Sequence, residues 1–242
     1  MYEIDLTKVH EESKKFANID LVPTNRQIKS NFKEFKFFQL NTFDDLKNFN
    51  DDTIRLEISK IKSNFESIVK DFLSDPKKSI LIATSENSVV GICIYSLLAK
   101  NVQLSQKLDK LDPDKTANIE FLFVQKGSRG FLLGQKLLAL AEYLSIEKGY
   151  SVGVIVIKNT DYFLLSTALA QSYTISSLDE SNFVLTCPLG KIIEDIVEQY
   201  SVKNTDMKWQ QDVLDLGFVG IKVINYKSND KFFVSYSKAY YN

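Results

Sequence analysis

The stretch that decides the fold is Glu120-Phe-Leu-Phe-Val-Gln-Lys-Gly-Ser-Arg-Gly-Phe-Leu-Leu-Gly-Gln-Lys-Leu-Leu138. An apolar strand ends at Val124, and a Gly-rich turn then leads into a helix that begins near Phe131. Glycine occurs only nine times in the 242 residues, and three of the nine lie between Gly127 and Gly134. The N–H groups at the start of a helix have no intrahelical partner and lie at the positive end of its dipole. The turn therefore predicts a cradle for a phosphate or pyrophosphate group.

The segments around this turn predict a mixed α+β domain. Apolar runs alternate with segments of helical periodicity, and turn residues separate them. The predicted strands cover residues 35–40, 79–83, 89–98, 117–124 and 151–157, and the predicted helices cover residues 6–16, 53–73 and 131–148. We expect one mixed, mostly antiparallel central sheet that is flanked by helices.

The remainder of the chain, after residue 159, predicts further helices and hairpins. The helices are expected at residues 162–171, 191–200 and 206–216, and the hairpins at residues 173–187 and 218–236. We find no repeat of fixed period and no low-complexity tract in the sequence.

The composition excludes several classes of function. The chain has 30 basic and 31 acidic residues and a net charge of −1, which excludes a chain-wide basic field for holding nucleic acid. His10, Cys93 and Cys187 lie far apart, so we expect no metal site and no histidine-based triad. No stretch reaches the roughly 18 apolar residues that span a bilayer, so we expect no membrane partner. Without an apolar run near the start, we predict a cytoplasmic location.

The quoted stretch resembles the acyl-CoA-binding motif of the GCN5-related N-acetyltransferases, the GNAT family. In that family a strand ending in Val is followed by [RQ]-x-x-G-x-[GA] at the opening of a helix. Here Arg129 lies five residues after Val124, and Gly134 fills the last motif position. The middle position, usually Gly in the family, is Leu132. The resemblance implies a GNAT-like fold with a divergent cofactor motif.

The resemblance also implies a cofactor, acetyl-CoA or another acyl-CoA, and a set of site residues. The strand backbone at Phe123 and Val124 would pair with the pantetheine amides. The turn's N–H groups would hold the pyrophosphate, and they belong to Arg129, Gly130, Phe131, Leu132, Leu133 and Gly134. Glu120 matches a position where the family often carries its general base, which would take the proton of an amine through water. Tyr95 is expected to line a substrate cleft where strands 117–124 and 151–157 separate.

The implied activity is acyl-CoA-dependent N-acyl transfer, in which an acetyl group moves to a primary amine by direct attack. The acceptor would be a small-molecule or protein amine, and a homodimer is kept as an open alternative. A second hypothesis is a catalytically degenerate acyltransferase-like domain that serves as an interaction or effector module, motivated by Leu132. A third is a toxin-type acyltransferase that acts on a macromolecule.

The predicted domain organisation is an N-terminal extension at residues 1–34 and an acyltransferase domain at residues 35–242. Two registers fit the family's pattern after residue 159. In the preferred one, Leu216-Gly217-Phe218 is the family's L-G-F ending, Val213 replaces its tyrosine general acid, and residues 160–205 are an insertion. In the second register, residues 173–187 are the terminal hairpin and Ser166 takes the tyrosine position.

Overall fold

The computed structural model describes residues 1–15, 35–49, 52, 55, 67, 74–75, 78–191, 193–194, 198–228, 231–238 and 240–241. Most of the predicted helix at residues 53–73 lies outside this part of the chain. The described α-helices are α1 (Leu6–Ser13), α4 (Val102–Lys107), α5 (Leu133–Glu147), α6 (Tyr162–Ala170) and α7 (Met207–Asp215). Short 3-10 turns are η1 (Phe43–Asn48), η2 (Leu98–Lys100) and η3 (Lys126–Ser128).

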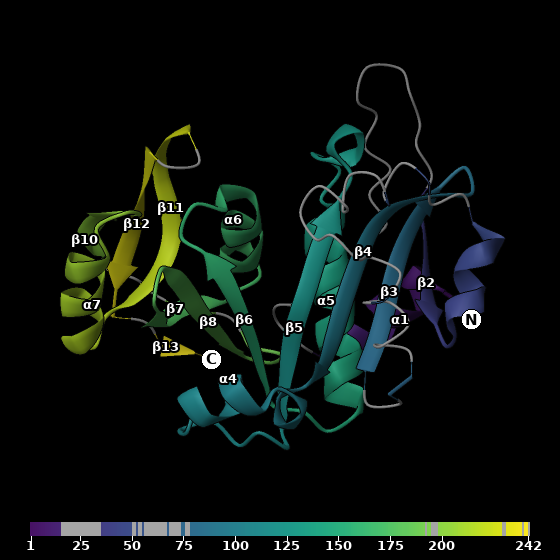
Figure 1. Ribbon diagram of the computed structural model, residues 1–242, viewed down its shortest axis with the longest axis horizontal. Helices are drawn as coiled ribbons and strands as arrows, with labels where there is room; N and C mark the ends of the chain where they lie inside the picture. The colour runs from purple at the N-terminus through teal and green to yellow at the C-terminus, as the bar shows by residue number, and fades with distance from the viewer. Residues whose placement is uncertain are drawn as a thin grey trace.

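The described strands form one large sheet and one small one. The large sheet contains β1 (Tyr2–Ile4), β2 (Lys36–Leu40), β3 (Lys78–Ser85), β4 (Ser88–Leu97), β5 (Thr116–Val124), β6 (Val152–Lys158), β7 (Thr174–Asp179), β8 (Asn182–Pro188), β10 (Glu198–Lys203), β11 (Val219–Ser228) and β12 (Lys231–Ser237). Its order is β1-β2-β3-β4-β5-β6-β8-β7-β11-β12-β10 (Figure 1). The small sheet pairs β9 (Ile193–Glu194) with β13 (Tyr240–Tyr241).

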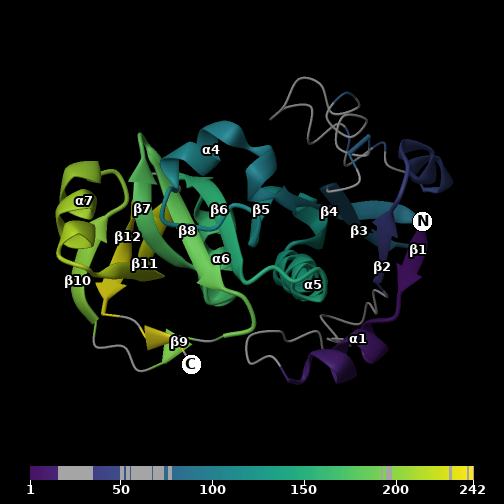
Figure 2. The same cartoon turned by 90° about the horizontal axis from the view of Figure 1, so that it is seen from below.

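Among the described strand pairs, β5 with β6 is parallel and the other neighbours are antiparallel. Helix α5 covers one face of the sheet and α4 lies on the opposite face (Figure 2). The predicted class, a mixed α+β fold with a mostly antiparallel sheet flanked by helices, is therefore confirmed.

The main core lies between α5 and the sheet. Leu133, Leu137 and Ala141 recur on one side of the helix and are buried, as the helical spacing predicts. Gly91 on β4 permits a close approach, because a Cβ there would lie 2.9 Å from the Leu137 Cδ1 atom. Helix α5 is thereby held firmly against the middle of the sheet, with its start at one end of β5.

Strands β5 and β6 separate partway along their length. Their pairing covers only Thr116–Ile119 and Val152–Ile155, and Figure 1 shows the two strands diverging beyond it. The divergence begins at a bulge in β5, where Glu120 is an extra residue without an opposite partner on β4. A bulge bends its strand and increases the local twist. The predicted separation of these two strands is thus present in the structure.

The C-terminal part differs from the prediction at one segment. Residues 191–200 were expected to be helical, but the described part contains β9 and the start of β10, which pairs with β12. The prediction is wrong there because pairing with a distant strand outweighs a weak local periodicity.

The sheet order also bears on the predicted domain boundaries. The hairpin beside β6 is β7–β8, which is the arrangement that the second register describes. Within residues 160–205, β7 and β8 lie between β6 and β11 in the large sheet, and the predicted insertion stays a prediction. At the other end, β1 pairs with β2, so the described part of residues 1–34 belongs to the same sheet.

Candidate functional site

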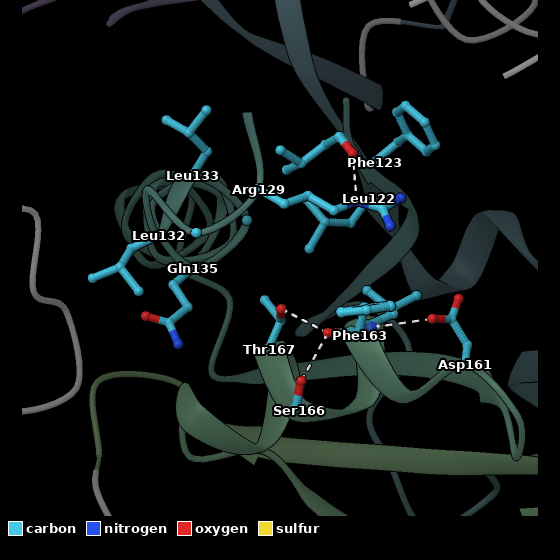
Figure 3. A pocket seen from close by; sticks show the side chains of 14 residues that line it. Leu122, Phe123, Arg129, Leu132, Leu133, Gln135, Asp161, Phe163, Ser166 and Thr167 are labelled. Carbon is cyan, nitrogen blue, oxygen red and sulfur yellow. Dashed lines mark hydrogen bonds between the residues drawn. The ribbon is translucent and has the colours of Figure 1, made fainter. Parts of the chain in front are cut away.

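A pocket of about 250 Å³ lies where β5 and β6 separate (Figure 3). Three elements form its walls, namely the end of β5, the turn leading into α5, and the first turns of α6. The lining residues are Leu122, Phe123, Val124, Arg129, Gly130, Leu132, Leu133, Gly134, Gln135, Asp161, Phe163, Leu164, Ser166 and Thr167.

The predicted cofactor residues gather at this pocket with one exception. Those that line it are Phe123, Val124, Arg129, Gly130, Leu132, Leu133 and Gly134. Phe131 instead packs against Phe35, with the two ring centroids 5.3 Å apart. Residues predicted from one short motif thus share one cavity, and their role in binding a cofactor stays a prediction.

The end of β5 offers an open strand edge to the pocket. The Gln125 N–H donates to the Val90 carbonyl of β4 at 2.9 Å. Because main-chain groups alternate in direction along an antiparallel strand, Phe123 also faces β4, whereas Leu122 and Val124 face the gap toward β6. The Val124 carbonyl accepts a hydrogen bond from Arg129 Nε at 3.1 Å. An extended ligand with amide groups would therefore find its partners at Leu122 and at the Val124 N–H more than at Phe123, because the Val124 carbonyl is already bonded to Arg129.

The start of α5 has no side-chain cap. Its N-cap is Leu132, and the Lys136 N–H donates to the Leu132 carbonyl at 3.0 Å. The first N–H groups of the helix, at Leu133, Gly134 and Gln135, therefore have no intrahelical acceptor, and these residues line the pocket. This end of the helix suits an anionic group.

Leu132 adopts the left-handed conformation, with φ 60° and ψ 18°. That conformation favours glycine, which explains physically why a glycine would suit the middle motif position. The Leu132 side chain is 38 % exposed, and Figure 3 shows it directed away from Arg129 and Phe163. Leu132 nevertheless belongs to the lining of the pocket.

The wall formed by α6 was missed by the sequence analysis. The Arg129 guanidinium lies 5.2 Å from the centroid of the Phe163 ring, so the two side chains bridge the turn before α5 and helix α6. A Cβ on Gly134 would lie 3.3 Å from Thr167 Cγ2, which shows how closely α5 approaches α6. The second register could have identified this wall, because it starts a helix after β6 and places Ser166 at a family position.

Asp161 begins this wall by capping α6. Its carboxylate accepts a hydrogen bond from the Leu164 N–H at 3.1 Å. A carboxylate at a helix N-cap satisfies one of the unpaired N–H groups of the first turn. The cap therefore fixes where α6 begins and how its first turn faces the pocket.

Glu120, the predicted general base, lies outside the pocket lining, at the point where the strands begin to separate. It is half-buried, and its Oε1 atom accepts a hydrogen bond from the Ser96 hydroxyl of β4. The bulge at Glu120 sets the direction of this side chain independently of the strand's alternation. The carboxylate is thus held in place close to the base of the opening.

Tyr95 does not line the pocket. Its side chain is 1 % exposed and belongs to the core cluster between α5 and the sheet. The Lys148 Nζ atom lies 5.1 Å from its ring centroid, and burial raises the pKa of the Tyr95 hydroxyl. The expectation that Tyr95 contacts a substrate is corrected by this placement, because its strand turns that residue toward α5.

Cysteine and metal chemistry find no support within the described part of the chain. Cys93 and Cys187 are free and buried, and burial raises the pKa of both thiols. No group of three or more His, Cys, Asp or Glu residues that could hold a metal ion occurs among the described residues. In the same residues, we find no helix with the length and apolar character that crossing a membrane requires.

Comparison with known proteins finds solved structures that are similar to this chain. No protein-family model matches it, and no curated protein matches it significantly. Among solved structures, it is similar to the PaiA N-acetyltransferase of Thermoplasma acidophilum in complex with coenzyme A (14 % identity, TM-score 0.48, 64 % of this chain and 99 % of the other). It is also similar to aminoglycoside 6'-acetyltransferase type Ii (13 %, 0.49, 63 % and 96 %).

A third similar structure is an acetyltransferase of the GNAT family from Staphylococcus aureus Mu50 (14 % identity, TM-score 0.47, 64 % of this chain and 99 % of the other). GNAT acetyltransferases are thus among the structures that this chain resembles, as residues 120–138 suggested. The likeness concerns the fold alone.

Proposed function

We propose that the chain is an acyl-CoA-dependent N-acyltransferase that moves an acetyl group to a primary amine by direct attack. The observation that carries the proposal is the pocket in which an open strand edge at Leu122 and Val124 meets the uncapped start of α5. Pantetheine is an extended chain with amides, which suits a strand edge. Pyrophosphate is an anion, which suits a helix start. Acetyl-CoA presents both groups in one ligand.

Glu120 is the residue that we propose as general base. When bound, acyl-CoA would supply the activated acetyl group, and the chain itself must accept the proton that the amine loses. The Glu120 carboxylate at the bulge can do so through a water molecule, and the Ser96 hydroxyl holds it in position. Ser166, which takes the family's tyrosine position in the second register, lines the pocket, and its hydroxyl donates to the Phe163 carbonyl at 3.1 Å, so it would offer its proton to a ligand only after turning away from that carbonyl.

We propose that the acyltransferase unit spans residues 36–188, and that residues 198–237 are an addition to it. This division follows the second register, because the hairpin β7–β8 lies beside β6. The cytoplasmic location and the identity of the acceptor amine stay predictions.

Binding is tested by isothermal titration of the folded protein with acetyl-CoA. We expect saturable binding, and we expect Leu132→Gly to bind at least as tightly, because glycine adopts the left-handed conformation without strain. Absence of heat at high micromolar acetyl-CoA, in protein shown to be folded by circular dichroism, would overturn the proposal.

Catalysis is tested by following the release of free CoA with a panel of amines that includes aminoglycosides, polyamines and lysine peptides. We expect Glu120→Gln to lower kcat by about 100-fold, the range of general-base contributions, without changing acetyl-CoA affinity. Glu86→Gln, at an exposed turn residue, is the matched control and should keep full turnover. The competing hypothesis of a degenerate interaction module predicts binding without turnover for every amine, and Glu120→Gln would then change nothing.

A further inference from the structure

Two segments of the C-terminal half share a short sequence and the same local structure. Ile157-Lys-Asn-Thr-Asp161 and Val202-Lys-Asn-Thr-Asp206 lie 45 residues apart. Each begins with the last two residues of a strand, β6 or β10, and precedes a helix of nine residues, α6 or α7. In each, the final Asp caps the helix by accepting from the N–H three residues later.

The strands around these helices repeat the same pairing. In the hairpin β7–β8 the bulge falls between Ile175 and Ser177, and in β11–β12 it falls between Gly220 and Lys222, again 45 residues later. On the next strands, Ile157 of β6 pairs with Phe183 of β8, and at the equivalent position Val202 of β10 pairs with Val234 of β12. The residue after each helix's C-cap is left-handed, Ser172 with φ 64° and Gly217 with φ 79°. We call residues 152–188 the first unit and residues 198–237 the second unit.

The two units face each other across a local two-fold axis. Their strands follow the order β6-β8-β7-β11-β12-β10, which places matching strands at equal distances from the centre. At the centre Ile175 pairs with Gly220, its own counterpart. Asn159 Nδ2 donates to the Asn204 carbonyl at 3.3 Å, and Asn204 Nδ2 donates to the Asn159 carbonyl at 2.8 Å. Contacts between identical positions are the signature of a two-fold interface.

The helices of the two units are exchanged across this axis. Helix α6 of the first unit packs against β11 of the second (Figure 1), and α7 of the second unit packs against β7 of the first as well as against its own β10. The ring of Tyr162 on α6 stacks on Tyr226 of β11 at 3.9 Å and meets Phe232 of β12 edge-on at 5.8 Å. Each unit therefore buries its helix partly on the other one.

We propose that the second unit is an internal copy of the first and serves as its built-in partner. The second unit covers the edge of β7 and the outer face of α6. If each molecule had only the first unit, two molecules could cover these surfaces for each other. The chain therefore needs no second molecule to cover the edge of β7, and we expect no dimer to form through this edge. The second unit also holds α6, one wall of the pocket. This proposal stands without the proposed function, because its evidence is pairing and packing alone.

The test is a disulfide across the axis in the full-length chain, Ile175→Cys with Gly220→Cys. A Cβ on Gly220 would lie 3.0 Å from the Ile175 Cβ, so a small adjustment reaches the 3.5–4.5 Å range of disulfides. Cys93 and Cys187 are buried and should not interfere. We expect oxidation to form the bond within one chain, with a mass near 27.7 kDa without reductant, whereas each single variant stays uncross-linked. A cross-linked dimer, or no bond in folded protein, overturns the proposal.

The wild-type chain provides a second measurement, in case the double variant does not fold. At low concentration, light scattering should give a monomer, and amide hydrogen exchange should show residues 174–179 protected in that monomer. A monomer in which this strand exchanges freely, or protection that appears only as a dimer forms, overturns the proposal. Neither readout involves acyl-CoA, so its outcome is separate from that of the proposed function.

Discussion

The two units share the same β-α-β-β arrangement, but they differ in what lies beside their first strand. In the first unit, β6 borders β5, and the opening between them holds the pocket. In the second unit, β10 takes the place of β6 and is the last strand of the sheet among the described residues. The candidate site therefore lies where β5 and α5 are placed beside the β-α-β-β arrangement of the first unit.

Side chains at equivalent positions of α6 and α7 differ in the same way, because only those of α6 line the pocket. Phe163, Ser166 and Thr167 of α6 line the pocket, and their counterparts on α7 are Lys208, Gln211 and Asp212. Helix α6 faces α5, whereas these α7 positions carry charged or amide side chains suited to water. The comparison shows that the β-α-β-β arrangement does not form the candidate site by itself. The site also requires β5 and α5, which lie beside the first unit.

The largest effect is expected from breaking the central contact with Gly220→Val. A Cβ at this position would lie 2.8 Å from Ile175 Cδ1 and 3.0 Å from Val234 Cγ1, so the larger residue forces the units apart. We expect a loss of about 3 kcal/mol in the free energy of unfolding, measured by urea denaturation. Gly127→Val, where a Cβ meets nothing within 4 Å, is the control. Equal stability of the two variants would contradict the close approach.

The next effect concerns the reciprocal asparagines. Asn204 is fully buried, donates to Asn159, and accepts from the Phe232 N–H at 3.3 Å, whereas Asn159 is partly exposed. We expect Asn204→Ala to cost about 2 kcal/mol and Asn159→Ala about 1 kcal/mol, because the first removes the bonds to both the Asn159 carbonyl and the Phe232 N–H, whereas the second removes the longer bond to the Asn204 carbonyl. Urea denaturation measures both losses. A larger loss for Asn159→Ala than for Asn204→Ala would contradict this description of the two asparagines.

A third prediction compares helix α6, which lines the pocket, with the equivalent helix α7. Ser166→Trp places a large ring in the pocket wall, and Gln211→Trp places the same ring at the matching position of α7. We expect the first variant to weaken acetyl-CoA binding at least about 10-fold, roughly 1.4 kcal/mol, and the second to leave it unchanged. Titration calorimetry measures both. Equal affinities in the two variants would place the ligand elsewhere.

The smallest effect tests the similarity of the two units. Asp161→Ala and Asp206→Ala remove matching helix caps, whose bonds to Leu164 and Trp209 are 3.1 and 3.2 Å. Each change should cost about 1 kcal/mol of unfolding free energy. Thermal and urea unfolding should show losses that agree closely. A clear inequality would show that the two helix starts are not equivalent.

Much of the first unit and its surroundings was predictable from the sequence. The strands at residues 79–98, 117–124 and 151–157 and the helix after the Gly-rich turn follow local patterns of apolar residues, and the structure contains them. The turn residues from Arg129 to Gly134 were singled out by their rarity and spacing, and most of them line one pocket. The α6 wall was not predicted, because it depends on which strand lies beside β6.

The helix and the hairpin of the second unit were predicted at residues 206–216 and 218–236, but the likeness of this unit to the first was not. Its match to the first unit is concentrated in the five residues 157–161 and 202–206, too short a stretch to stand out as a repeat. The matching strands share a pairing pattern, not side chains; Leu185 and Tyr236, for example, occupy equivalent positions. Register is a property of two strands together, so it cannot be read from either strand alone.

By itself, the sequence determined the local features of this protein. Apolar alternation, the Gly-rich turn and the caps at Asp161 and Asp206 depend on residues a few positions apart, whose interactions the chain order already contains. Tertiary structure alone decided the burial of Tyr95, the place of α6 beside the pocket, and the two-fold match of the units. These features depend on contacts between distant segments, and only the packed core selects among the pairings that local patterns allow.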